Sequence, residues 1–144
     1  MKKTRFIACL FVLSLISLTF TSCEKEKSLS ELIIGKWEVQ TERQIFTLQN
    51  DPKFEYLSYY EADELAFEFT TGGGIIIYQD GEVYSILTYT LSGNTMTVGT
   101  GGTDKVWKNI AVDGNRLSWS EFTTATYETA TYNVEVIYTT EKKN

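Results

Sequence analysis

From residue 35 to the C-terminus, apolar and polar side chains alternate along short segments that end in turn-forming residues. In the segment 64–69, for example, Leu65, Phe67 and Phe69 point one way and the residues between them point the other way. A period of two is typical of a strand with one buried face and one face in water. Such half-buried strands belong to antiparallel sheets joined by hairpins, so the pattern predicts an all-β domain.

Eight segments show this pattern, and turns separate most of them at intervals of eight to twelve residues. The segments are residues 35–45, 64–69, 75–79, 83–91, 95–98, 105–112, 116–122 and 131–140. Asp80-Gly81, between two of them, is a strong hairpin signal. Because eight hairpin-linked strands can close on themselves and so remove the exposed edges, we predict an antiparallel, eight-stranded up-and-down β-barrel. An immunoglobulin-type sandwich is the second candidate.

A short helical turn is expected directly before the barrel. Ser28 and Glu31 have the spacing of a capping box, and Gly35 is placed to end the turn. The barrel domain is therefore predicted to span residues 29–144.

The N-terminus has the features of a bacterial lipoprotein signal. Residues 1–5 are mostly basic, and residues 7–20 form an uncharged, mostly apolar run that fits the helical core of a signal peptide but is short for a membrane span. The run ends at Phe20-Thr21-Ser22-Cys23, which resembles a lipobox. This resemblance implies cleavage before Cys23, a diacylglycerol group on the Cys23 thiol and a further acyl chain on the new amino group, with palmitate among the acyl chains that would hold the protein on a membrane. The alternative is a simple membrane anchor or secretory signal with a buried cysteine.

Lipidation would divide the N-terminus into a signal peptide, residues 1–22, and a lipidated cysteine with a charged tether, residues 23–28. It places the protein in the cell envelope, at the outer membrane. The acidic flank of Cys23 resembles signals that export some Bacteroidota lipoproteins to the cell surface, and a plain solvated spacer explains it equally well, so the membrane face stays open. Cys9 would be lost with the signal peptide, so no internal disulfide is expected. The net charge would change from −6 to −9, because three basic residues and no acidic one are removed.

The composition excludes several classes of function. The chain contains no histidine, which rules out Ser-His-Asp and Cys-His nucleophilic sites and histidine-ligated zinc. Its net charge of −6 makes it a poor partner for nucleic acid. The carboxylates of residues 61–64 lack the spacing of an EF-hand loop, and residues 99–102 lack the lysine and helix of a phosphate-binding loop. We therefore predict no catalysis, no metal and no cofactor, and the sequence identifies no protein partner.

Two segments resemble a known family. Gly35-Lys36-Trp37, after the helical turn, resembles the Gly-x-Trp signature that opens lipocalin barrels, and residues 87–98 resemble a hairpin common in small lipocalin-like lipoproteins of Bacteroidota. The resemblance covers about residues 31–140 and implies that Gly35 allows a sharp turn into the first strand, that Trp37 plugs one end of the barrel, and that the barrel binds small apolar molecules. The chain lacks the disulfides and C-terminal helix of well-studied lipocalins. It also lacks their late arginine, which Lys142 or Lys143 would replace only in part.

The alternation selects a set of candidate inward-facing residues. They are Trp37, Val39, Leu65, Phe67, Phe69, Leu87, Tyr89, Met96, Trp119, Tyr132, Val134 and Tyr138. Such an interior is either a cavity for one small apolar ligand or a space filled by its own side chains. In the first case the protein binds a ligand; in the second it is an interaction or structural module of the envelope.

The aromatic, polar stretch of residues 46–63 also has two interpretations. It is either a lid or partner-binding patch, or an irregular extension of the first strand whose aromatic side chains pack on the barrel. The candidate ligand contacts combine this stretch with the interior. They are Phe67, Phe69, Tyr89, Trp119 and Tyr132 from the barrel and Tyr59 and Tyr60 from the stretch.

Overall fold

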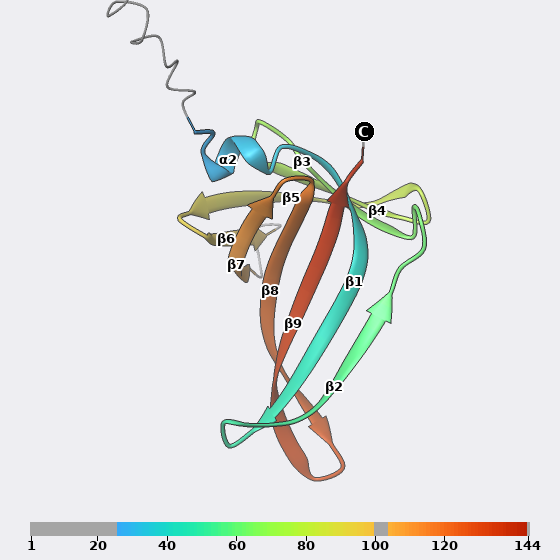
Figure 1. The fold of residues 1–144 in the computed structure, drawn as a ribbon, viewed down its shortest axis with the longest axis vertical. Helices are drawn as coiled ribbons and strands as arrows, with labels where there is room; N and C mark the ends of the chain where they lie inside the picture. Colours follow the sequence, from blue (N-terminus) through green and yellow to red (C-terminus); the bar gives the residue numbers. More distant parts are fainter. Residues whose placement is uncertain (1–25, 100–103, 144) are drawn as a thin grey trace, which may run out of the picture.

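A computed structural model describes residues 26–99 and 104–143 of the chain. Within these ranges a short helix precedes nine antiparallel strands (Figure 1). The elements are α2 (Leu29–Leu32), β1 (Gly35–Leu48), β2 (Asp51–Tyr59), β3 (Leu65–Phe69), β4 (Gly74–Gln79), β5 (Glu82–Ser92), β6 (Thr95–Gly99), β7 (Lys105–Asp113), β8 (Arg116–Tyr127) and β9 (Ala130–Lys142). The predicted signal peptide and Cys23 lie outside the described residues.

Eight of the strands close into a barrel. From β3 to β9 each strand pairs with the next one along the chain, and β1 pairs with β3 on one side and with β9 on the other. The predicted all-β, antiparallel, up-and-down barrel is therefore confirmed. The expected helical turn is also present as α2, where the backbone N–H of Ser28 donates to the Glu31 carboxylate at 2.8 Å.

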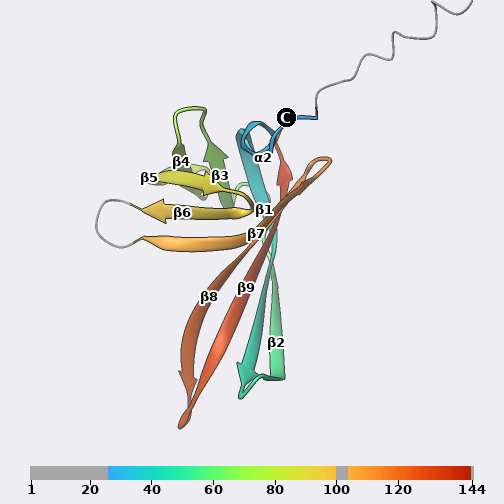
Figure 2. The ribbon, with the colours of Figure 1, turned by 90° about the vertical axis from the view of Figure 1, so that its left-hand side faces the viewer.

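The ninth strand, β2, lies outside the barrel. It pairs with the second half of β1, from Thr41 opposite Tyr59 to Leu48 opposite Asp51. Along one edge β1 therefore changes its neighbour from β3 to β2, while β9 stays on its other edge. Beyond the barrel, β2, β1, β9 and β8 continue as a sheet of a single layer, seen almost edge-on in Figure 2. We term this extension, residues 41–59 and 122–137, the arm.

Residues 46–63 differ from the structure expected for them. Instead of an irregular extension packed on the barrel, most of this stretch forms an antiparallel hairpin, whose pairing is interrupted by one bulge at Lys53. Its turn residues Gln49 and Asn50 both have positive φ, 52° and 64°, as tight hairpin turns that match the strand twist require. The aromatic side chains pack on one another: the ring centroids of Phe46 and Phe54 are 4.6 Å apart, and those of Phe54 and Tyr132 are 5.2 Å apart.

A β-bulge in β1 changes which side chains face the barrel interior. Val39 pairs with Thr140, but the next pair is Thr41 with Thr139, so Gln40 is an extra residue on the β1 side. An extra residue shifts the alternation by one position. Simple alternation along residues 35–45 would place Thr41 on the face of Trp37 and Val39, but because of the bulge Glu42 follows them on that face instead.

The core fills the end of the barrel that α2 covers. Trp37 is fully buried, and its indole N–H donates to the carbonyl oxygen of Ile33 at 2.6 Å. The Lys142 ammonium lies 5.1 Å from the Trp37 ring centroid, a cation–π contact on the side chain expected to plug the barrel. The cluster of buried residues around Trp37 consists of Ile33, Val39, Phe67, Phe69, Ile75, Met96, Val98, Trp107, Ile110, Leu117 and Trp119.

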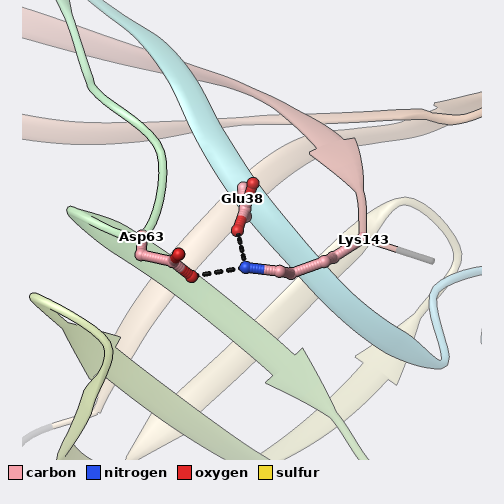
Figure 3. A network of polar contacts seen from close by, with 3 residues as sticks. All are labelled: Glu38, Asp63 and Lys143. Carbon is pink, nitrogen blue, oxygen red and sulfur yellow. Dashed lines mark hydrogen bonds and ion pairs between the residues drawn. The ribbon is translucent and has the colours of Figure 1, made fainter.

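The last residues of the chain are tied back to the barrel by an ion-pair network (Figure 3). The Lys143 ammonium contacts the carboxylates of Glu38, on β1, and Asp63, in the loop before β3. The backbone N–H of Lys143 also donates to the carbonyl oxygen of Lys36 at 2.9 Å. The hydrogen bond and charge of Lys143 lower the pKa of Asp63, and the hydrogen bonds to Asp63 and Glu38 raise the pKa of Lys143.

We expect Lys143→Met to raise the Asp63 pKa toward that of an unpaired aspartate, as measured by a carboxyl NMR titration. Because the folded-state pKa of Asp63 is lowered, the contribution of this pair to stability is present above the ordinary aspartate pKa and is lost as the pH falls through the lowered value. Lys53→Met, which removes a lysine paired with Asp51 in the arm, is the control and should leave Asp63 unchanged. An Asp63 pKa that is identical in wild type and Lys143→Met would contradict the assignment.

Candidate ligand-binding cavity

A cavity of about 400 Å³ lies among inward-facing side chains of seven barrel strands. Its lining consists of Phe67, Ile77, Leu87, Val98, Gly99, Lys105, Trp107, Glu121 and Tyr138. This volume is within the range of small-molecule sites. Larger hollows of about 500 to 610 Å³ exist, but loops and polar side chains border most of their surface. The largest of them shares Lys105 and Glu121 with the cavity.

One wall of the cavity is a stack of aromatic rings from three neighbouring strands. Trp107 and Trp119 stack with centroids 4.9 Å apart and planes at 18°, and Trp119 and Tyr138 stack at 5.1 Å and 23°. Phe67 meets both indoles edge-on, at 5.6 Å from Trp107 and 5.1 Å from Trp119. Stacked and edge-to-face contacts of this kind hold aromatic rings in fixed positions, so the wall is preformed.

The polar part of the lining is formed by Glu121, Lys105 and Tyr138. The Lys105 ammonium is 3.9 Å from a Glu121 carboxylate oxygen. Burial raises the pKa of Glu121, and the charge of Lys105 opposes that rise. Burial also raises the pKa of Tyr138, and the negative charges of Glu121 and Glu42 add to the effect. The lining itself therefore holds one carboxylate and one ammonium group, and the carboxylate of Glu42 lies close enough to act on both Glu121 and Tyr138.

Glu42 lies beside this polar lining, where the arm leaves the barrel. Its carboxylate accepts hydrogen bonds from the Tyr60 hydroxyl at 2.8 Å and from the Gln44 amide at 2.6 Å. Burial, followed by the hydrogen bond to Glu42, raises the pKa of Tyr60 to about 12. Tyr60 therefore stays protonated at neutral pH and keeps donating to the Glu42 carboxylate.

Two buried donors face the same region. Among the described residues, the indole Nε1–H groups of Trp107 and Trp119 have no hydrogen-bond partner at normal geometry. Both groups nevertheless lie close enough to Glu121 to lower its pKa against the effect of burial. Glu121 is thus an acceptor in the neighbourhood of both indole groups, at a geometry outside that of a normal hydrogen bond.

Only some of the predicted ligand contacts lie at the cavity. Phe67 lines the cavity, and Trp119 lies in its aromatic wall. Phe69 and Tyr89 pack on each other at 5.7 Å in the core but do not line the cavity, and the Tyr89 hydroxyl donates to the Thr70 carbonyl oxygen at 3.2 Å.

The remaining predicted contacts lie away from the cavity. Tyr132, expected inside the barrel, packs in the aromatic cluster of the arm, because β8 and β9 extend past the point where the barrel ends. Tyr59 is exposed at the end of β2, and Tyr60 packs against the core beside Glu42.

Sequence reasoning missed several lining residues, among them Ile77, Trp107 and Glu121. Ile77 stands in the unbroken apolar run of residues 75–78, in which alternation cannot assign a face. Trp107 precedes an irregularity in β7, where the pairing passes from Lys108 to Ala111 and Asn109 has a φ of 56°. A signal for Glu121 was present, because it follows Trp119 by two residues on the same strand.

Comparison of the chain with protein-family models, with curated proteins and with solved structures gives no significant match. The fold and the cavity define the class: a closed, eight-stranded antiparallel β-barrel domain with an interior cavity and one additional strand. In the part of the chain that the structure describes, no helix has the length and apolar character of a membrane span. Within those same residues, no group of three potential metal ligands is found.

Proposed function

We propose that this protein binds a small, largely apolar molecule inside its barrel without converting it, while a lipid on Cys23 holds it at the outer membrane. The single observation that carries the binding proposal is the cavity of about 400 Å³, whose walls include Phe67, Leu87 and Val98. The resemblance to lipocalin-like lipoproteins supports it, since Gly35-Lys36-Trp37 stands where α2 leads into β1. The lipobox-like sequence before Cys23 supports the anchor.

A neutral probe, 1-decanol, tests the cavity through tryptophan emission, because Trp107 and Trp119 form its wall. We expect a saturable change in emission, and we expect Leu87→Phe to weaken binding at least tenfold by filling space, a cost of about 1.4 kcal/mol. Ile86→Phe is the matched control, since Ile86 is the neighbouring residue on β5 but is 66% exposed and does not line the cavity. Equal affinities of the two variants, or no saturable change in wild type, would refute the proposal.

Anchoring is tested separately with Cys23→Ser in cells fed labelled palmitate. We expect the label to disappear from the protein and the protein to leave the membrane fraction, because serine offers no thiol to carry the diacylglycerol group that bears the acyl chains. Cys9→Ser is the control: Cys9 belongs to the segment expected to be removed, so labelling should be unchanged. Label on the Cys23→Ser variant would show that Cys23 is not the sole attachment point.

The arm favours a second function, that of an interaction module of the envelope. Its sheet has a single layer, and the aromatic cluster on one face includes Tyr56 and Tyr127, which are both about 60% exposed. Exposed apolar patches of this kind mark contact sites in many proteins. If no neutral probe enters the barrel, the interaction module becomes the better account of the protein.

A further inference from the structure

We propose that the ligand of the barrel cavity is an amphipathic amine, whose ammonium group binds the Glu121 carboxylate while its apolar part lies against Phe67, Leu87 and Val98. This inference rests on the proposed binding function and adds the chemical class of the ligand. It is carried by three features of the polar lining: the charge around Glu121, the free hydrogen-bonding capacity of its carboxylate, and the apolar side chains that face it.

The charges around Glu121 favour a cation. The carboxylate of Glu42, on β1, lies near it, the hydroxyl of Tyr138, on β9, belongs to the same lining, and Lys105, on β7, is the positively charged residue of that lining. The side chain of Lys105 is 73% exposed and its ammonium is 3.9 Å from Glu121, whereas the side chain of Glu121 is 23% exposed. An exposed partner at that distance is screened by water, so it neutralises the half-buried carboxylate only weakly.

The Glu121 carboxylate also has unused hydrogen-bonding capacity. An ionised carboxylate accepts about four hydrogen bonds. The indole N–H groups of Trp107 and Trp119 approach it from the aromatic wall, and Trp107 also lines the cavity; both indoles are at least 97% buried. An ammonium group approaching from the cavity would use the remaining lone pairs and hold the carboxylate in position for both indoles, which otherwise remain buried donors without a partner.

The same arrangement disfavours an anionic amphiphile. A carboxylate head placed in the polar part of the cavity would lie beside Glu121 and Glu42, and like charges at short range in a half-buried site repel strongly. A neutral hydroxyl head can donate to Glu121 but lacks the charge that makes ionic hydrogen bonds about twice as strong as neutral ones. Affinity is therefore expected to fall in the order amine, alcohol, carboxylate for a common alkyl chain.

The test compares decylamine, 1-decanol and decanoate at pH 7.5 by calorimetry or tryptophan emission. Each probe is kept below the concentration at which it forms micelles or separates from water. We expect decylamine to bind at least tenfold more tightly than 1-decanol, and decanoate at least tenfold more weakly. Glu121→Gln should lower the ratio of the affinities for decylamine and 1-decanol at least tenfold, because the variant keeps a hydrogen-bonding side chain at this position but removes its charge. Glu82→Gln, which removes one exposed carboxylate from β5 outside the cavity, controls for net charge and should keep the preference.

Each outcome decides the inference. If 1-decanol binds and decylamine binds no better, or if decanoate binds best, the amine assignment is overturned and the cavity proposal stands. If none of the three probes binds, the proposed function fails and the inference fails with it. If Glu121→Gln does not fold, the order of the three affinities in wild type decides: a tenfold preference for the amine supports the inference, and its absence overturns it.

Discussion

Trp37→Ala is expected to lower the free energy of unfolding by about 3–5 kcal/mol, a large part of the 5–15 kcal/mol typical of a domain. Trp37 is fully buried, so the substitution leaves a large void at the end of the barrel near α2. It also removes the 2.6 Å hydrogen bond to Ile33, which leaves that carbonyl oxygen unpaired, and the cation–π contact with Lys142. Urea unfolding followed by circular dichroism measures the change in free energy.

The control is Tyr84→Ala on β5, which removes another aromatic ring from a strand of the same barrel. Tyr84 is 72% exposed, so its loss should change the free energy of unfolding by no more than about 0.5 kcal/mol. A Trp37→Ala protein as stable as Tyr84→Ala would mean that Trp37 does not close the barrel end.

The second large effect is expected in amide hydrogen exchange. Amides of the arm should exchange at least about a hundredfold faster than those of the barrel strands, because a single-layer sheet exposes both of its faces and opens locally. Peptides that cover residues 46–57 and 124–131 represent the arm, and peptides that cover residues 94–98 and 116–120 represent the barrel. Mass spectrometry of exchange at neutral pH measures the difference.

The variant Phe46→Ala tests whether exchange in the arm depends on its aromatic cluster. Phe46 contacts Phe54, Tyr56 and Tyr132 in the arm and is not part of the barrel core. The variant should therefore speed exchange in the arm and leave the barrel peptides unchanged. Equal protection of arm and barrel in wild type would show that the two open as one cooperative unit.

The barrel could be predicted because its strands obey simple alternation between clear turns. Leu65, Phe67 and Phe69 alternate with polar or small residues, and the turns at Asp80-Gly81 and Gly93-Asn94 adopt the positive φ values that such residues allow at Asp80, Gly81 and Gly93. The closure of eight strands followed from their number and from the short connections between them.

The arm was not predicted because its signals are weak. Pro52 and the charged residues around it suggest a loop, and the turn at Gln49-Asn50 lacks glycine. The stability of this hairpin comes from aromatic contacts between residues far apart in the sequence, such as Phe54 and Tyr132. Pairing of that kind depends on the fold and leaves no local pattern.

Some lining residues of the cavity were not predicted, because their strands depart from simple alternation of apolar and polar residues. The irregularity in β7 shifts the alternation along that strand, so Trp107 was missed. Glu121 was missed because a charged residue in an apolar series is normally assigned to the wet face, whereas here it stands among inward-facing residues. A charged residue on the inward face of a barrel indicates a functional site, but an analysis of periodicity alone assigns such a residue to the outer face.

Three strands, β1, β8 and β9, run unbroken from the tip of the arm into the wall of the barrel. Glu42, Glu121 and Tyr138 sit on these strands where the two parts meet. The two parts therefore share one piece of hydrogen-bonded backbone, so a partner bound at the tip of the arm and a molecule bound in the cavity would contact the same three strands.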